Sequence, residues 1–250
     1  MSTIFDRHGI RHLSPSALAL WKAEPALYVG RYLLRWTDDV GPNAWLGNAV
    51  EAGLTAWLYK RDIATAKEAA DREWLNKSQG DVSEDVEAVK ARITPMLGMA
   101  IEATRGINEA PTSAQAKVEC WLDGIPVPII GYTDLEWPDS IIDLKTTKAM
   151  PSAPRADHVT QMAVYWRGRD REKSCSLLYV TDKKHAVYRL EPEDMERALD
   201  DLRATARTLM RFLSRVRDGH DAIALLPADT TGYRWSDNLR ERLNAERMAD

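Results

Sequence analysis

The chain of 250 residues has only two cysteines, Cys120 and Cys175. Two thiols cannot build a disulfide scaffold, a four-cysteine zinc site or a four-cysteine iron–sulfur cluster. No run of about 18 apolar residues is present, so we expect no helix that spans a membrane. The N-terminal region also lacks the basic stretch followed by an apolar run that is typical of a secretory signal. These absences predict a cytoplasmic protein.

The chain also has little net charge. Its 34 Lys and Arg against 38 Asp and Glu give −4 at pH 7. This balance argues against a protein that coats nucleic acid by bulk charge, but it leaves room for a local basic groove. Residues 141–189 hold ten Lys or Arg against five Asp or Glu. The 44% of hydrophobic residues excludes intrinsic disorder, and the length fits one large domain or two small ones.

The first hundred residues are predicted to be mostly helical. Ser14 suits a helix N-cap and Pro15 the first helical position. Glu24-Pro25 interrupts this helix, and a second one is expected from Ala26 to Leu34. Residues 1–12 are expected to be a frayed start and 37–43 a loop, with further helices at Ala44–Tyr59, 64–76 and 82–105.

The pattern then changes to alternating and β-branched residues. Strands are expected at 116–122, 125–136, 141–146, 176–181 and 186–190, with helices at 155–167 and from 191 to about 217. The tail after Leu226 is polar and poorly patterned. This order predicts an α/β fold with a mixed sheet and a mostly helical N-terminal portion. We expect a single domain with a helical part (12–110), a sheet core (115–190), and a C-terminal helix and tail (191–250).

The most informative stretch surrounds the turn sequence Trp137-Pro-Asp-Ser140. If the strands on either side pair as a hairpin, Asp134 faces Asp143, Leu135 faces Ile142, and residue 136 faces residue 141. Cross-strand partners lie about 5 Å apart on one face. Lys145, two residues past Asp143, shares that face. Leu135, Ile142 and Leu144 then point the other way, into the core.

Two carboxylates and an ammonium on one patch suggest a metal site. Adjacent aspartates repel each other unless a cation lies between them, and oxygen ligands suit Mg²⁺ or Mn²⁺. Such an ion lowers the pKa of a bound water and polarises a phosphoryl oxygen, while Lys145 can stabilise charge on the phosphate. The residues suit phosphodiester hydrolysis. Spacing alone leaves an exposed Asp–Lys–Asp surface patch as an equal alternative.

These residues match a known family. Asp134 followed by Asp143-Leu-Lys145 resembles the core motif of the PD-(D/E)XK nuclease superfamily. Gln161-Met-Ala-Val-Tyr165 looks like the Gln-x-x-x-Tyr motif of its RecB-type exonucleases. Leu13-Ser-Pro-Ser-Ala-Leu18 looks like their opening helix, and Gly47-Asn-Ala-Val-Glu51 lies where they commonly have Gly-x-x-x-His. The resemblance implies a restriction-endonuclease-like mixed central sheet flanked by helices.

The resemblance also implies roles for individual residues. Lys145 would be the catalytic lysine, and a pair on one helix face, Gln161 and Tyr165, would touch DNA or that lysine. A carboxylate in place of the commoner histidine can still bind a hard cation. The implied ligands of one or two Mg²⁺ or Mn²⁺ ions are Glu51, Asp134, Asp143 and the backbone carbonyl of Leu144.

Further residues are candidates for DNA contact. Thr146, Thr147 and Lys148 follow the catalytic lysine, where they either meet phosphate or merely end a strand. Ser14 and Ser16 begin a helix whose N-terminus can bind phosphate, although Ser14 is expected to act mainly as a cap. Glu119 is either an additional ligand or an exposed residue, and we favour the exposed reading.

The resemblance predicts a metal-dependent DNA exonuclease of recombination or repair, similar to phage-encoded enzymes. A structure-specific or restriction-like endonuclease, a non-catalytic DNA-binding scaffold and a small-molecule phosphohydrolase stay open. The expected partners are DNA, further copies of the chain in a ring, and a recombination protein such as a single-strand annealing protein, in the cytoplasm of a bacterial or phage-infected cell.

Many relatives in this branch carry an iron–sulfur cluster held by one early and three late cysteines. Here the early position resembles Glu24, and the segment from Tyr233 onward has no cysteine. We therefore expect no cluster, and packing through Trp235 in its place.

Overall fold

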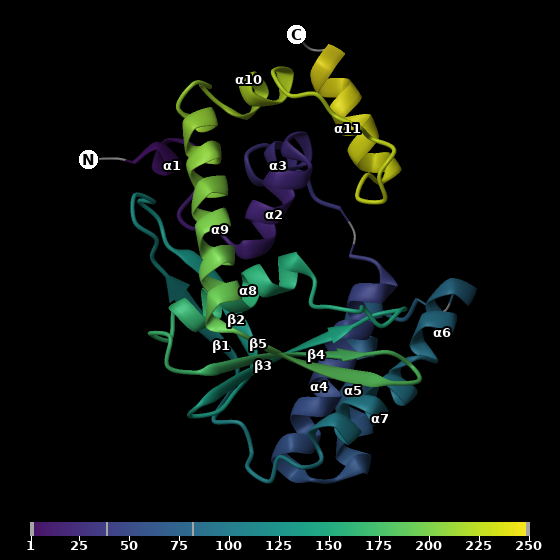
Figure 1. The fold of residues 1–250 in the computed structure, drawn as a ribbon. Helices are drawn as coiled ribbons and strands as arrows, with labels where there is room; N and C mark the ends of the chain where they lie inside the picture. The colour runs from purple at the N-terminus through teal and green to yellow at the C-terminus, as the bar shows by residue number, and fades with distance from the viewer. Residues whose placement is uncertain (1–2, 39, 82, 249–250) are drawn as a thin grey trace.

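A mixed β-sheet lies at the centre of the protein, which was analysed as a computed structural model describing residues 3–38, 40–81 and 83–248 (Figure 1). In the described chain the sheet has five strands in the order β1-β2-β3-β4-β5. All neighbours are antiparallel except β3 and β4, which are parallel. This confirms the expected α/β class. The strands are β1 (Ser113–Cys120), β2 (Ile129–Glu136), β3 (Ser140–Thr146), β4 (Ser174–Val180) and β5 (His185–Leu190).

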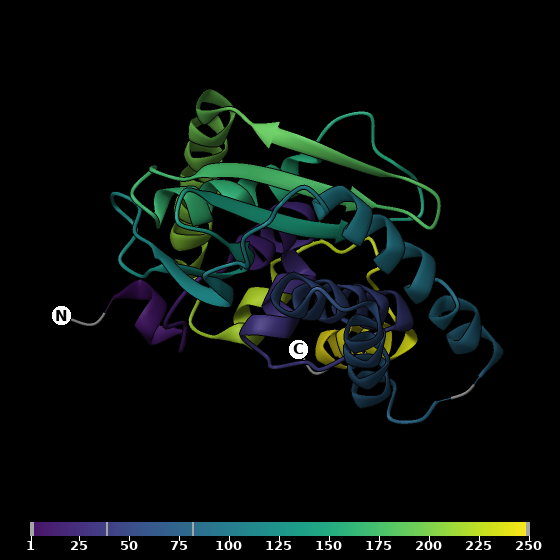
Figure 2. The same cartoon turned by 90° about the horizontal axis from the view of Figure 1, so that it is seen from below.

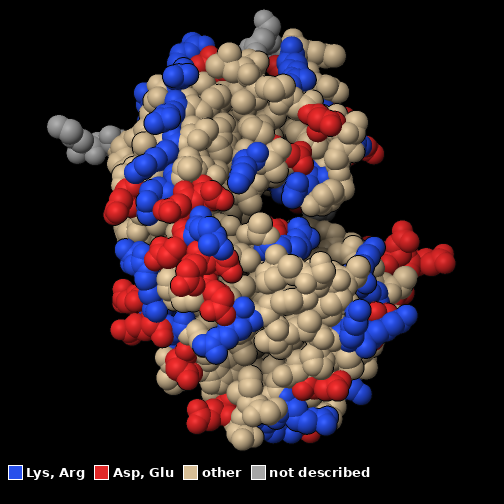
Figure 3. All heavy atoms as spheres, in the orientation of Figure 1, with Lys and Arg blue, Asp and Glu red and all other residues tan. Residues whose placement is uncertain are grey.

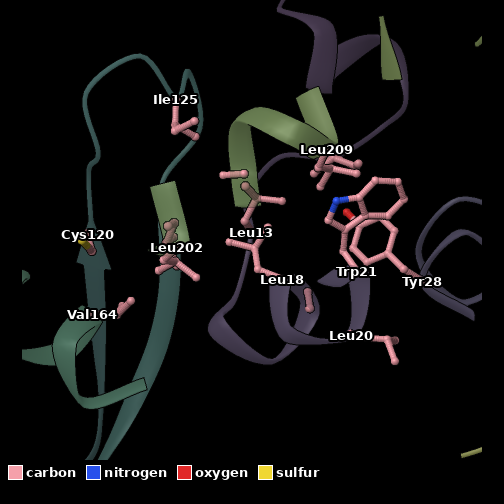
Figure 4. Packing of buried hydrophobic residues seen from close by; sticks show 14 of the residues in the cluster. Leu13, Leu18, Leu20, Trp21, Tyr28, Cys120, Ile125, Val164, Leu202 and Leu209 are labelled. Atoms are coloured by element: carbon pink, nitrogen blue, oxygen red, sulfur yellow. The ribbon is translucent and has the colours of Figure 1, made fainter. Parts of the chain in front are cut away.

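Helices on one side of the sheet form the larger hydrophobic core. The crossover helix α8 (Ala156–Arg167) packs on β1, β2 and β4, and it contacts both α2 (Pro15–Ala23) and α9 (Pro192–Leu213). Figure 4 shows buried side chains of this cluster, with the Trp21 ring beside that of Tyr28. The two ring centroids are 5.6 Å apart at an edge-on angle of 71°. The other helices of this part are α1 (Ile4–Arg7), α3 (Pro25–Tyr32), α10 (Gly219–Ala224) and α11 (Asp237–Met248).

A second group of helices covers the other face (Figure 2). Helix α4 packs on β3, and α7 packs on β4 and β5. Leu135 and Leu144 are buried in this cluster and Ile142 packs against it, as the alternation predicted. No helix among the described residues is long and apolar enough to cross a membrane. This group comprises α4 (Pro42–Lys60), α5 (Ile63–Ser78), α6 (Glu84–Lys90) and α7 (Ile93–Thr104).

Local sequence signals explain most helix starts. The Ser14 side chain accepts a hydrogen bond from the amide of Ala17, which confirms its cap role. Proline occupies the first turn of α2, α3, α4 and α9, where its missing N–H costs nothing.

Strand β1 lies about three residues earlier than expected and α9 ends about four residues earlier. Four further differences from the sequence expectations have a local cause. The helix expected over 82–105 is divided into α6 and α7, because Pro95 fits only the first turn of a helix. Residue 82 itself lies outside the described residues. In the expected frayed start, α1 forms over Ile4–Arg7 because Thr3 and Asp6 make a capping box. Residues 1 and 2 are not described.

The other two differences concern β2 and the tail. The strand expected from residue 125 begins only at Ile129, after a turn with Gly124 at φ 77°. The tail is not irregular throughout, since α10 and α11 form there. Helix α11 buries only Leu239 and Leu243, too few apolar residues for a clear pattern. Residue 39 in the loop and the last two residues lie outside the described chain.

Candidate active site

The candidate site opens into a cleft of about 1440 Å³ beside the sheet. Side chains from α2, β1, β2, β3 and α8 line it, together with residues 36–38, 40, 41, 233 and 234. Figure 3 shows the molecule hollowed near the middle of one face, with Lys or Arg atoms at the rim. The cleft brings together six of the residues singled out from the sequence: Ser14, Ser16, Asp134, Lys145, Gln161 and Tyr165.

The hairpin β2–β3 supplies the two aspartates. Its register matches the expectation, with Leu135 opposite Ile142 and Glu136 opposite Ile141. Asp134 and Asp143 are not ladder partners, however, because the Asp134 carboxylate accepts a hydrogen bond of 2.8 Å from the Leu144 amide. The β2–β3 pairing therefore ends at Leu135 and Ile142, one residue before Asp134 and Asp143.

Asp143 and Lys145 form a buried ion pair under the cleft. The Lys145 Nζ atom lies 2.6 Å from Oδ2 of Asp143. The Asp143 side chain is 0% exposed and that of Lys145 is 19% exposed. Lys145 thus reaches the cleft while Asp143 lies beneath it.

Burial shifts the pKa values of the charged residues in this site. Burial, with the charges of Asp143 and Glu51, raises the pKa of Asp134 well above its ordinary value. Burial also raises the pKa of Asp143, although Lys145 opposes it. For Lys145, burial lowers the pKa, but the facing carboxylates Asp143 and Asp134 outweigh it and the net pKa is raised. Lys145 is therefore a cation at neutral pH, among carboxylates that lack sufficient positive charge.

Helix α8 holds Lys145 through a chain of hydrogen bonds. Lys145 Nζ donates to Gln161 Oε1 at 3.0 Å, and the Gln161 amide nitrogen donates to the Tyr165 hydroxyl. The Tyr165 ring lies against Gly131 of β2, where an added Cβ would be 2.5 Å from a ring carbon. Gly131 therefore permits the close approach of Tyr165, which in turn sets the position of Gln161.

Glu51 on α4 points toward the same site. Its pKa is raised by burial and by the charge of Asp143. The Glu51 carboxylate accepts a hydrogen bond from Gln115 of β1. Gly47, one turn earlier, would place a Cβ 3.4 Å from the Thr146 hydroxyl, so a small residue here lets α4 approach the end of β3.

Gln115 is a site residue that the sequence interpretation missed. The β1–β2 register places it across from Asp134, but neither residue is paired there, and Gln115 has a left-handed φ of 54°. Only the register reveals this relation, and the long β1–β2 connection gives no sequence signal for it.

The carboxylates suit a divalent cation in part. Both oxygens of Asp143 are buried; Oδ2 is paired with Lys145, and Oδ1 has no partner in the described structure, and hard oxygen ligands are those that Mg²⁺ and Mn²⁺ prefer. Yet within the described ranges no three His, Cys, Asp or Glu side chains are grouped to hold one ion. Asp134 and Asp143 are the buried carboxylates beside Lys145, and the ligand roles of Asp134, Asp143, Glu51 and the Leu144 carbonyl stay predictions.

The candidate DNA contacts are less uniform. Ser14 and Ser16 line the cleft, with their hydroxyls 3.1 Å apart. The Thr147 hydroxyl is already used, since it donates to the Ala149 carbonyl at 2.9 Å. Thr146 is half-buried beside α4, and Lys148 is exposed. Glu119 is exposed and 2.6 Å from Lys117, in agreement with the favoured reading.

Much of the basic charge between 141 and 189 is internally neutralised. Arg169 and Lys173 both bind the buried Glu136, at 2.8 and 3.2 Å. Arg171 binds Glu196 at 2.7 Å. These cations hold the sheet and helices together, so the local excess in the sequence overstates the charge free to meet phosphate.

The comparisons identify the family. The family model of the PD-(D/E)XK nuclease superfamily matches residues 12–228. The chain belongs to the PD-(D/E)XK nuclease superfamily. The match includes Asp134, Asp143 and Lys145, whose assignment to the family motif stays a prediction from the sequence. Among curated proteins none matches significantly.

One solved structure has the same overall fold at low sequence identity. One similar structure is a "Putative exonuclease" from Eubacterium rectale, with a TM-score of 0.57 and 13% identity over 92% of this chain and 88% of that one. Another is SSO0001, with a TM-score of 0.32 and 16% identity over 64% of this chain and 84% of that one.

Side-chain contacts connect the segments around Glu24 and Trp235. The Glu24 carboxylate accepts hydrogen bonds from the Trp235 indole and, at 3.3 Å, from Arg234. Trp235 is 3% exposed. Cys120 and Cys175 are buried in β1 and β4. The packing expected through Trp235 is thus present. We call the hydrogen bonds from Arg234 and Trp235 to Glu24 the clasp.

Proposed function

We propose that this PD-(D/E)XK protein is a Mg²⁺- or Mn²⁺-dependent DNA exonuclease. The observation that carries the proposal is the pair of buried carboxylates, Asp134 and Asp143, which share the single ammonium of Lys145 under the cleft. Oδ2 of Asp143 is paired with Lys145, while Oδ1 is buried without a partner among the described residues, and a second buried carboxylate is costly unless a further cation accompanies it. The adjacent Asp134 adds a second carboxylate whose raised pKa reports the same deficit of positive charge.

The protein's own residues would act on a phosphodiester in the cleft. Lys145, held by Asp143 and Gln161, presents a fixed positive charge that stabilises the charge developing on the phosphate. Tyr165 and Gln161 keep that ammonium in place. A divalent ion bound by Asp134, Asp143 and the Leu144 carbonyl would activate a water and polarise the phosphoryl oxygen.

The first test is degradation of linear duplex and single-stranded DNA with Mg²⁺ or Mn²⁺. Asp143→Asn and Lys145→Ala should each lose activity by at least about 10²-fold. Asp139→Asn is the matched control, because Asp139 is exposed at the turn of the same hairpin. Wild-type protein that degrades no DNA with either metal would contradict the proposal.

The products distinguish the mode of attack. Mononucleotides released from linear DNA, with closed circles left intact, support an exonuclease. Cleavage of closed circles would instead indicate an endonuclease. DNA binding without any cleavage would indicate a scaffold, and the Asp143→Asn variant should then bind as the wild type does.

The proposal extends to the biological setting. We place the enzyme in DNA recombination or repair of the phage type, in the bacterial cytoplasm where its substrate lies. Its proposed partners are DNA, a ring of identical chains and a single-strand annealing protein. Light scattering of the purified protein, alone and with DNA, measures the oligomeric state.

A further inference from the structure

A histidine and a tyrosine lie beside the catalytic lysine without a role in the family motif. Tyr179 of β4 is the register partner of Lys145 of β3. His158 on α8 lies one turn before Gln161, which binds Lys145, and it lines the cleft. The rings of His158 and Tyr179 pack with centroids 5.5 Å apart.

The hydrogen bonds of Tyr179 favour one position for the proton of the His158 ring. The Arg155 amide donates to the Tyr179 hydroxyl at 3.1 Å, and the His158 Nδ1 atom lies 2.6 Å from the same oxygen. The Arg155 bond uses a lone pair of the hydroxyl, so its single proton is available to Nδ1. With Nδ1 as an acceptor, a neutral ring carries its proton on Nε2.

The surroundings keep the His158 ring neutral. Burial and the charge of Lys145 lower the pKa of His158 to about 4, against the opposing effect of Asp157. Asp157 Oδ2 approaches His158 Nε2 only to 4.0 Å, beyond hydrogen-bond distance. In the part of the chain that the structure describes, Nε2 therefore has no hydrogen-bond acceptor, although its ring borders the cleft.

We propose that the Nε2–H group of His158 binds a non-bridging phosphate oxygen of the substrate, next to the phosphate that Lys145 contacts. The inference rests on the proposed nuclease function. A neutral donor is suited to this position, because a second cation would pair with the carboxylates of the site. Tyr179 acts as a positioning residue that holds the ring in the donating orientation.

The test compares variants of His158 in the full-length protein. His158→Leu removes the donor and should lower kcat/KM by about 10- to 100-fold, as expected for a lost hydrogen bond to a charged group. His158→Gln keeps an N–H donor and should recover most of this loss. Tyr179→Phe should give an intermediate loss. His8→Gln is the control, since His8 binds the Leu213 carbonyl outside the cleft.

A phosphorothioate substrate separates this role from a packing role. Sulfur in place of the bound oxygen accepts hydrogen bonds poorly, so it should slow the wild type for one stereoisomer but have a smaller effect on His158→Leu. Equal sulfur effects in both proteins, or equal defects in His158→Gln and His158→Leu, would overturn the inference.

The failure of the proposed function is recognised separately. If the wild type cleaves DNA and His158→Leu cleaves it with the same kcat/KM, only this inference is refuted. If the wild type binds DNA without cleaving it, the variants' Kd values in Ca²⁺ test the contact, and an unchanged Kd for His158→Leu refutes it. A wild type that neither cleaves nor binds DNA refutes both proposals.

Discussion

Gly131→Ala should disturb the candidate active site indirectly, through Tyr165. The new Cβ would lie 2.5 Å from a ring carbon of Tyr165, about 1 Å or more inside an ordinary contact. Tyr165 is 1% exposed, so its ring is held by packing on most sides. The ring must shift, and Gln161 and Lys145 must follow through their hydrogen bonds.

The size of the effect follows from opposing contributions. Overpacking a well-packed site costs about 1–3 kcal/mol. Replacing glycine lowers the entropy of the unfolded chain and returns about 0.4–1 kcal/mol. The net loss should therefore be about 0.5–2.5 kcal/mol, measured by urea unfolding. A displacement near 1 Å should also lower nuclease activity by about 10²-fold.

Two controls make the result interpretable. Gly98 on α7 has no neighbour within 4 Å of an added Cβ, so Gly98→Ala should stabilise the protein by about 0.5–1 kcal/mol. In a Tyr165→Ala background the cost of Gly131→Ala should vanish. Unchanged stability and activity in Gly131→Ala would refute the reasoning that Tyr165 positions the catalytic lysine.

Three further predictions concern charges and the clasp. Because burial raises the pKa of Asp134, the folded, metal-free protein retains a proton that the unfolded chain loses, so stability falls as pH rises above about 4. Asp134→Asn should reduce this fall, to which Asp143 and Glu51 also contribute, and raise Tm in chelator at pH 8 by at least about 2 °C; the same pH dependence in both proteins would contradict the assignment. Gln115→Ala removes the hydrogen bond that orients the Glu51 carboxylate. The Mn²⁺ concentration needed for half-maximal activity should therefore rise 10- to 100-fold, whereas an unaltered titration would mean that Glu51 takes no part in metal binding. Glu24→Ala leaves the buried Trp235 indole without its acceptor and should cost about 1–3 kcal/mol in urea unfolding, while a midpoint equal to that of the wild type would show that the clasp carries no stability.

The sequence was sufficient where the signal is local. The turn at 137–140 and the alternation around it predicted the β2–β3 register, and the Ser14-Pro15 start of α2 was correct. Helix α11 escaped notice because two buried leucines give a weak period. The division of the expected 82–105 helix into α6 and α7 follows from proline chemistry at Pro95. The apolar pattern continues on both sides of Pro95 and therefore predicted one helix.

The interactions around the site depended on contacts between distant segments. Gln115 reaches Glu51 from another part of the chain, and Glu136 takes up two cations that the sequence had suggested for DNA. Charge counts along a chain do not show which charges pair in space, since pairing depends on packing. The free fraction of the basic segment was therefore overestimated.

The sequence by itself determined the motif residues Asp134, Asp143 and Lys145, because hairpin geometry and a period of two place them near one another. Only the tertiary structure decided what surrounds them. It buried Asp143 against Lys145 with one carboxylate oxygen unpaired, stacked Tyr165 on Gly131, and set the Tyr179 hydroxyl against His158. These features arise where α8 crosses the sheet, and such a crossing is set by the packing of whole elements rather than by any local run of residues.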